Sequence, residues 1–142
     1  MKRGMIVAVL CGGIWMCGNA LGQETVVTNL IVKGTVSQGT NAIAAGAQSA
    51  AFGEGAMADG NYSHAEGDTT TAGGTASHAE GALTVAGGDQ SHAEGLATEA
   101  LAGNSHAGGA YARVRTQDSN SFIHATGTAT NDMKETQYSD TA

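Results

Sequence analysis

The pentapeptide Ser-His-Ala-Glu-Gly occupies residues 63–67 and recurs at 77–81 and 91–95, and a near copy, Ser-His-Ala-Gly-Gly, follows at 105–109. Each copy begins fourteen residues after the one before it. Self-similarity at a fixed period is the signature of a repeat architecture, in which each unit stacks on its neighbour. The pentapeptide therefore decides the fold, and it raises the question of why histidine and glutamate recur with it.

The period extends well beyond the pentapeptide. Segments of fourteen residues counted from Thr35 align without a gap through Asp118, and we expect a degenerate seventh segment from Ser119 to Asp132. Positions one, three, eight and ten hold mostly small residues, with the period of two that strand side chains require. Glycine recurs at position twelve as far as Gly88, and at position five, where we expect it in turns. The position-five glycines are Gly39, Gly53, Gly67, Gly81, Gly95 and Gly109, and Ile123 breaks the series.

This pattern predicts an all-β parallel roll, or solenoid, of about seven coils, each with two short strands and two tight turns. The interior must be narrow, because it accepts only alanine, serine, threonine or glycine. A helix is excluded because glycine recurs twice per repeat and no apolar stripe of period 3.6 exists. We assign residues 23–34 to an N-terminal strand and cap, 35–118 to the repeats, 119–132 to a last coil that caps the roll, and 133–142 to a polar tail.

The first 22 residues have the features of a signal peptide. Lys2 and Arg3 precede a mainly apolar run from Met5 to Cys17, and Ala20 and Gly22 are the small residues that a signal peptidase reads. The run is short for a membrane span, which needs about 20 residues. We therefore expect cleavage before Gln23 and export of the remainder, without a direct membrane anchor in this chain.

Cleavage would change the charge and the cysteine content. Cys11 and Cys17 would leave with the leader, so the exported part would have no disulfide or thiolate ligand. Four basic residues would remain against thirteen acidic ones, a net charge of −9 by count. This balance argues against binding to nucleic acid, which relies on lysine and arginine at phosphates.

Histidine and glutamate stand at positions two and four, which alternate with the inward positions and so face outward. General acid–base catalysis needs a unique pair in a preorganised site, whereas these residues recur coil after coil. We therefore expect no enzyme activity, no catalytic residue and no cofactor. Stacked imidazoles could bind a divalent ion between chains, but we favour hydrogen bonds from histidine to glutamate across chains and predict no metal.

The repeats at 63–76, 77–90 and 91–104 resemble the head repeats of YadA-like trimeric autotransporter adhesins, as a His/Glu variant of the usual Ser-Val-Ala-Ile-Gly. The resemblance covers about residues 35–118. It implies a left-handed roll that packs into a homotrimer at the bacterial surface, with positions two and four at the trimer axis. The interface residues carried over in this way are Val36, Phe52, His64, Glu66, His78, Glu80, His92, Glu94, His106 and Phe122.

The resemblance implies a secreted or cell-surface adhesin head that attaches to host matrix, cells or surface polymers. The chain departs from the family after residue 131, where a coiled-coil stalk and membrane barrel are expected but a polar stretch follows. The alternative is a spacer or assembly module of a fibre or envelope that binds no ligand. Arg113 and Arg115 form a local basic spot that could contact a receptor, although we favour a capping role for the region after Gly109.

Overall fold

The computed structural model describes residues 9–10, 13–14, 34–127 and 134–135. The chain divides into two compact units, residues 1–31 and 32–142. In the first unit, β1 (Val9–Leu10) pairs antiparallel with β2 (Gly13–Ile14). Most of the predicted signal peptide (1–22) and nearly all of the predicted N-terminal strand (23–34) lie outside the described residues. No helix among the described residues is long and apolar enough to cross a membrane.

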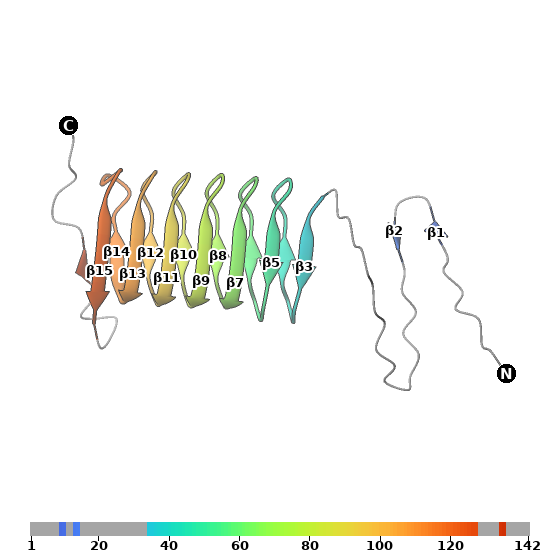
Figure 1. The fold of residues 1–142 in the computed structure, drawn as a ribbon, viewed down its shortest axis with the longest axis horizontal. Coiled ribbons are helices and arrows are strands. Elements are labelled where there is room, and N and C mark those ends of the chain that lie inside the picture. The colour runs from blue at the N-terminus through green and yellow to red at the C-terminus, as the bar shows by residue number, and fades with distance from the viewer. Residues whose placement is uncertain (1–8, 11–12, 15–33, 128–133, 136–142) are drawn as a thin grey trace. The chain divides into compact units, whose positions relative to one another are not determined.

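The second unit is a stack of coils in which each coil contributes one strand to each of two parallel sheets (Figure 1). We call the first the pentapeptide sheet, because its strands contain the repeated motif. Its strands are β3 (Val36–Gln38), β5 (Ala50–Phe52), β7 (His64–Asp68), β9 (His78–Ala82), β11 (His92–Leu96), β13 (His106–Ala110) and β15 (Phe122–Thr126).

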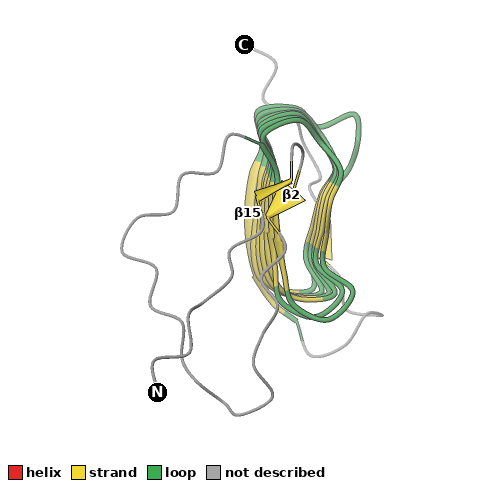
Figure 2. Cartoon of the chain, turned by 90° about the vertical axis from the view of Figure 1, so that its right-hand side faces the viewer, coloured by secondary structure: helices red, strands yellow, loops and turns green. Residues whose placement is uncertain are grey.

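The second sheet, here the opposite sheet, is built from shorter strands. They are β4 (Ile43–Ala44), β6 (Met57–Ala58), β8 (Thr71–Ala72), β10 (Val85–Ala86), β12 (Glu99–Ala100), β14 (Ala112–Val114) and β16 (Lys134–Glu135). Seen along the stack, the two sheets face each other and loops join them at both edges (Figure 2). The predicted all-β solenoid of fourteen-residue coils is confirmed, and residues 134–135 of the predicted tail form a strand that pairs with β14.

The core consists of the small side chains that the repeat places between the sheets. Alanines at position three, such as Ala79, and at position ten, such as Ala86, are fully buried. Serines at position one are also buried, and most turn their hydroxyl back to the backbone, as Ser63 Oγ does by donating to the carbonyl oxygen of Gly60 at 2.7 Å. The predicted inward positions one, three, eight and ten are thereby confirmed in the central coils.

Buried threonines at position eight differ in their hydrogen bonds. Thr84 is fully buried, and its Oγ1 has no hydrogen-bond partner in the described part of the chain, whereas Thr98 Oγ1 donates to the carbonyl oxygen of Glu94 at 3.1 Å. A buried hydroxyl without a partner is costly, and valine has nearly the same shape. We expect Thr84→Val to raise the free energy of unfolding by about 1 kcal/mol and Thr98→Val to lower it by about 1 kcal/mol. Urea unfolding measures both changes, and equal effects at the two positions would contradict the assignment.

Four of the six position-five glycines are placed differently from the prediction. Gly39 and Gly53 lie in bends just after β3 and β5, whereas Gly67, Gly81, Gly95 and Gly109 lie inside strands and not in turns. Their φ angles are positive, and a Cβ built on Gly81 would lie 2.1 Å from the carbonyl oxygen of Gly95 in the next coil. Close stacking of the coils therefore excludes a side chain there. Most turn residues with left-handed backbone are not glycine, and they occupy positions seven and fourteen: Asn41, Gln48, Tyr62, Thr69, Ala76, Leu83, Gln90, Ala97, Asn104 and Tyr111.

The last coil begins two residues later than the sequence alignment places it. The alignment put Ser119 at position one, Phe122 at position four and Ile123 at position five. In the structure Phe122 pairs with His106 and Ile123 with Ala107, so they occupy positions two and three. The coil that starts at Ser105 is therefore sixteen residues long.

The two extra residues lie in the turn that follows β14. In this turn Arg115 Nε contacts Asp118 Oδ2 at 2.9 Å, and Asp118 is only 3% exposed. The backbone N–H of Asp118 also donates to the carbonyl oxygen of Arg115. A buried carboxylate held by an arginine and a backbone bond is a local structure that the fixed period does not contain, and it sets the length of this coil.

Candidate functional site

Two columns of polar side chains run along the outer face of the pentapeptide sheet. In the parallel register His64, His78, His92 and His106 are successive partners, and so are Glu66, Glu80 and Glu94. We call these seven residues the ladder. Each is half-buried in the single chain, since each alternates along its strand with an inward residue. The repeat thus places seven titratable groups on one face.

The histidine column is a stack of aromatic rings. The ring centroids of His64 and His78, and of His78 and His92, are 4.8 Å apart with nearly parallel planes, and His106 turns its ring by 67° from that of His92. A phenylalanine contacts each end: Phe52, from the glutamate column, meets His64 edge-on at 5.7 Å, and Phe122, which continues the histidine column, lies 4.8 Å from His106. The column therefore has an apolar ring at each end and imidazoles between them.

Histidine and glutamate approach each other without forming hydrogen bonds. Nε2 of His64 lies 3.8 Å from Glu66, Nε2 of His92 lies 3.6 Å from Glu80, and Nε2 of His106 lies 3.3 Å from Glu94. Hydrogen bonds from nitrogen to oxygen usually span about 2.7–3.2 Å. Nε2 of His78, His92 and His106 is shielded from solvent and has no hydrogen-bond partner among the described residues. The histidine–glutamate bonds were predicted between chains and stay a prediction, while within one chain no such bond forms among the described residues.

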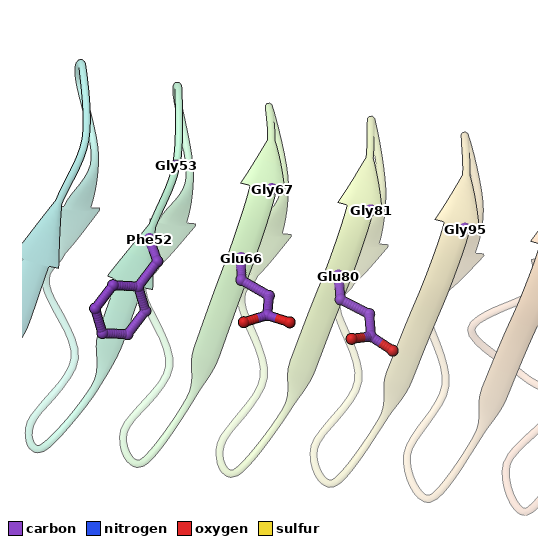
Figure 3. Close-up of a pocket in the computed structure, with 7 residues that line it drawn as sticks. All are labelled: Phe52, Gly53, Glu66, Gly67, Glu80, Gly81 and Gly95. Carbon is purple, nitrogen blue, oxygen red and sulfur yellow. The ribbon is translucent and has the colours of Figure 1, made fainter.

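An open groove of about 550 Å³ follows the glutamate column (Figure 3). Phe52 stands at one end, and Glu66 and Glu80 extend their carboxylates over it. The remaining lining residues are glycines from four successive coils, Gly53, Gly67, Gly81 and Gly95. Because glycine has no side chain, the groove floor is backbone, and the groove can receive side chains that project from another surface.

The ladder changes at the C-terminal end of the roll. A Cβ built on Gly108 would lie 2.9 Å from Glu94 Oε1 and about 3.1 Å from both His106 Nε2 and His124 Nδ1. Glycine at this position four therefore leaves space that three polar groups surround. Sequence reasoning missed His124, because the fixed period assigned position four of the last coil to Phe122. The alternative serine start at Ser121, two residues after Ser119, was the available signal.

The ten residues predicted for a trimer interface share one face of the roll. They belong to successive strands of the pentapeptide sheet, from Val36 in β3 to Phe122 in β15. Nine occupy the predicted columns, while Phe122 joins the histidine column and not the glutamate column. Phe122 is 69% exposed, which makes it the most exposed of the large apolar side chains in the described part of the chain.

The basic spot predicted at Arg113 and Arg115 is matched by acidic groups. Arg113 Nε contacts Glu99 Oε2 at 2.8 Å between adjacent strands of the opposite sheet, and Arg115 pairs with Asp118. Both arginines therefore contribute to holding the last coils together, and neither presents an isolated positive charge.

The ladder joins imidazole nitrogens, carboxylate oxygens and an open groove on one face, a combination suited to binding a cation or another chain. Comparison of the chain with protein-family models, with curated proteins and with solved structures finds no significant match. Its function therefore has to be inferred from its own residues.

Proposed function

We propose that this chain is a YadA-like head: a secreted or cell-surface homotrimer of β-rolls that attaches to host matrix, cells or surface polymers. The observation that carries the proposal is the half-exposed face formed by the ladder and its two phenylalanines. In the family that the repeats resemble, the corresponding positions line the axis between three rolls. The bacterial surface location rests on the same resemblance and on the signal-peptide features of residues 1–22.

Packing of the pentapeptide sheets of neighbouring chains against one another would bury aromatic side chains that a single chain exposes to water. Phe52 and Phe122 lie at opposite ends of the ring column, and burying an aromatic ring between chains is worth about 25 cal/mol per Å² of apolar surface. The glycine-floored groove beside the glutamates gives a neighbouring roll room to approach the backbone closely. A trimer would thus bury the rings of Phe52 and Phe122 at the two ends of its interface, with the polar ladder residues between them.

Attachment suits a surface that varies from coil to coil. The outward position nine of the opposite sheet reads Ile43, Met57, Thr71, Val85, Glu99 and Arg113. This face would remain outside when the pentapeptide sheets pack together, and its irregular chemistry is what a specific protein or polysaccharide contact needs. A spacer would need no such face, so binding decides between the two functions.

The oligomeric state is the first test. Light scattering of the purified chain is expected to give three times the mass of one chain. Phe122→Ser is expected to shift the monomer–trimer equilibrium toward monomer by about tenfold or more, since an interface aromatic contributes above about 1.4 kcal/mol. Tyr62→Ser is the matched control, because Tyr62 is 62% exposed in the turn before β7 and belongs to neither column of the ladder. A wild-type monomer, or equal effects of the two variants, would count against the packing.

Attachment is tested separately on the trimer. Saturable binding of the wild-type chain to immobilised matrix proteins or surface polysaccharides supports adhesion, and substitutions at Ile43 and Met57 on the opposite sheet are then expected to weaken it. A stable trimer that binds nothing across a broad panel would make the spacer function the better one.

A further inference from the structure

We propose that five residues of the ladder bind divalent transition-metal ions within a single chain, at two sites that share one carboxylate. The first site consists of Glu66, His78 and Glu80, and the second of Glu80, His92 and Glu94. Every ligand comes from one chain, so the sites need neither the trimer nor adhesion. The inference differs from the sequence-based prediction, which included no metal.

The geometry of each group suits a small cation. One histidine nitrogen and two carboxylate oxygens can be chosen in each group such that all three atoms lie within 4.8 Å of one another. Zinc binds imidazole nitrogen and carboxylate oxygen at about 2.0–2.2 Å in tetrahedral geometry, so its ligand atoms lie about 3.3–3.6 Å apart. The glutamate side chains are half-exposed and can close the remaining difference by a change of rotamer.

Two further observations point to a positive charge at these places. Nε2 of His78 and of His92 is shielded from solvent yet has no hydrogen-bond partner among the described residues. Glu66, Glu80 and Glu94 stack in register at the strand spacing of about 4.8 Å, where like charges repel. A metal ion would bind the free nitrogens and offset the repulsion between carboxylates.

The ligand set selects the kind of ion. Imidazole with carboxylate suits zinc and neighbouring first-row metals, whereas calcium and magnesium prefer oxygen ligands alone. Three protein ligands leave a coordination position open on the groove side, which water or a side chain from a neighbouring chain could fill. Zinc is therefore the probe of choice, and calcium is the control ion.

The same histidine column contains its own control residues. Beside His64, the coil before it has Phe52 and not glutamate at position four. Beside His106, its own coil has Gly108 at that position. Each of these histidines has one ladder carboxylate within 4 Å, Glu66 and Glu94 respectively, and neither belongs to a three-ligand group among the described residues. They belong to the same column as His78 and His92, His64 with a parallel ring and His106 with a turned one, but they lack the second carboxylate.

The test is calorimetric titration of zinc chloride into the purified full-length chain and three variants. The wild type is expected to bind up to two ions per chain and to melt at a higher temperature with zinc than with calcium. His78→Gln with His92→Gln should weaken zinc binding by about 100-fold or more, because loss of even an outer partner of a ligand costs about 10–100-fold. His64→Gln with His106→Gln should stay within about threefold of the wild type. Cys11 and Cys17 are replaced by serine in all four chains, because thiolates bind zinc and would add a site outside the ladder.

Glu80→Gln provides a second route to the same answer, because it removes the carboxylate common to both sites while leaving the ring stack intact. It is expected to reduce zinc affinity by at least about tenfold. If the His78/His92 variant fails to fold by circular dichroism, this variant decides the question. Absence of zinc binding by the wild type, or equal losses in the two histidine pairs, would overturn the proposal without affecting the test of trimer mass.

Discussion

Replacing Gly74 by alanine is expected to lower the free energy of unfolding by at least about 3 kcal/mol, enough to unfold a marginal domain. An alanine Cβ at this position would lie 2.0 Å from the carbonyl oxygen of Gly88 in the next coil. That oxygen belongs to backbone fixed by the coil stack, so no side-chain movement can relieve the overlap. Thermal and urea unfolding followed by circular dichroism measure the loss.

The neighbouring residue provides a matched control. A Cβ built on Gly73 would meet nothing within 4 Å, and its φ lies outside the positive region. Gly73→Ala is therefore expected to be neutral or to stabilise by about 0.4–1 kcal/mol, because alanine restricts the unfolded chain. Similar losses at the two adjacent glycines would mean that coil stacking does not set the requirement for glycine.

The coil stack could be predicted from sequence because its rule is local and repeated. A narrow space between two sheets admits only small side chains, so alanine at Ala65, Ala79 and Ala93 marks the interior without knowledge of the turns. The same period fixed which residues face outward, and the histidine and glutamate columns followed from it. Because the same positions recur in every coil, each coil gives independent support for the assignment of inward and outward residues.

The prediction went wrong where local structure departs from the period. The turn after β14 holds two extra residues around the ion pair of Arg115 with the buried Asp118. The fixed period therefore placed the start of the last coil at Ser119, whereas the coil begins at Ser121. The change from glycine to Ala102 at position twelve fits this longer turn, because the following coil there no longer repeats the fourteen-residue path. The sequence shows that glycine is lost at position twelve, but only the backbone register shows where the next coil begins.

The sequence predicted which residues lie together on one face, but not which of their side chains form hydrogen bonds. Spacing alone places His78 and His92 in one column, but whether an imidazole bonds to a carboxylate depends on side-chain rotation and on distances of a few tenths of an ångström. Gly108 illustrates what the sequence does not show. In the sequence it is one glycine among many, whereas in the structure its missing side chain leaves an opening beside Glu94, His106 and His124. Such openings depend on how neighbouring coils meet.

Replacing Ala79 by leucine is expected to have the second-largest effect, a loss of about 3 kcal/mol or more in the free energy of unfolding. Ala79 is fully buried between the sheets and stacks in register with Ala65 and Ala93. Three added carbon atoms have no space unless the sheets separate, and separation would pull the adjacent coils out of contact as well. The roll is therefore expected to tolerate added volume less well than an ordinary core, in which overpacking costs about 1–3 kcal/mol.

Ala82→Leu is the control for this change, because the same strand carries Ala82 at position six, where its partner in the next coil is already Leu96. Leu96 is 42% exposed, so leucine at this position does not enter the core. Urea unfolding should show a change within about 0.5 kcal/mol for Ala82→Leu. If Ala79→Leu proved equally mild, the space between the sheets would be deformable, and the small residues at positions three and ten would need another cause than steric exclusion.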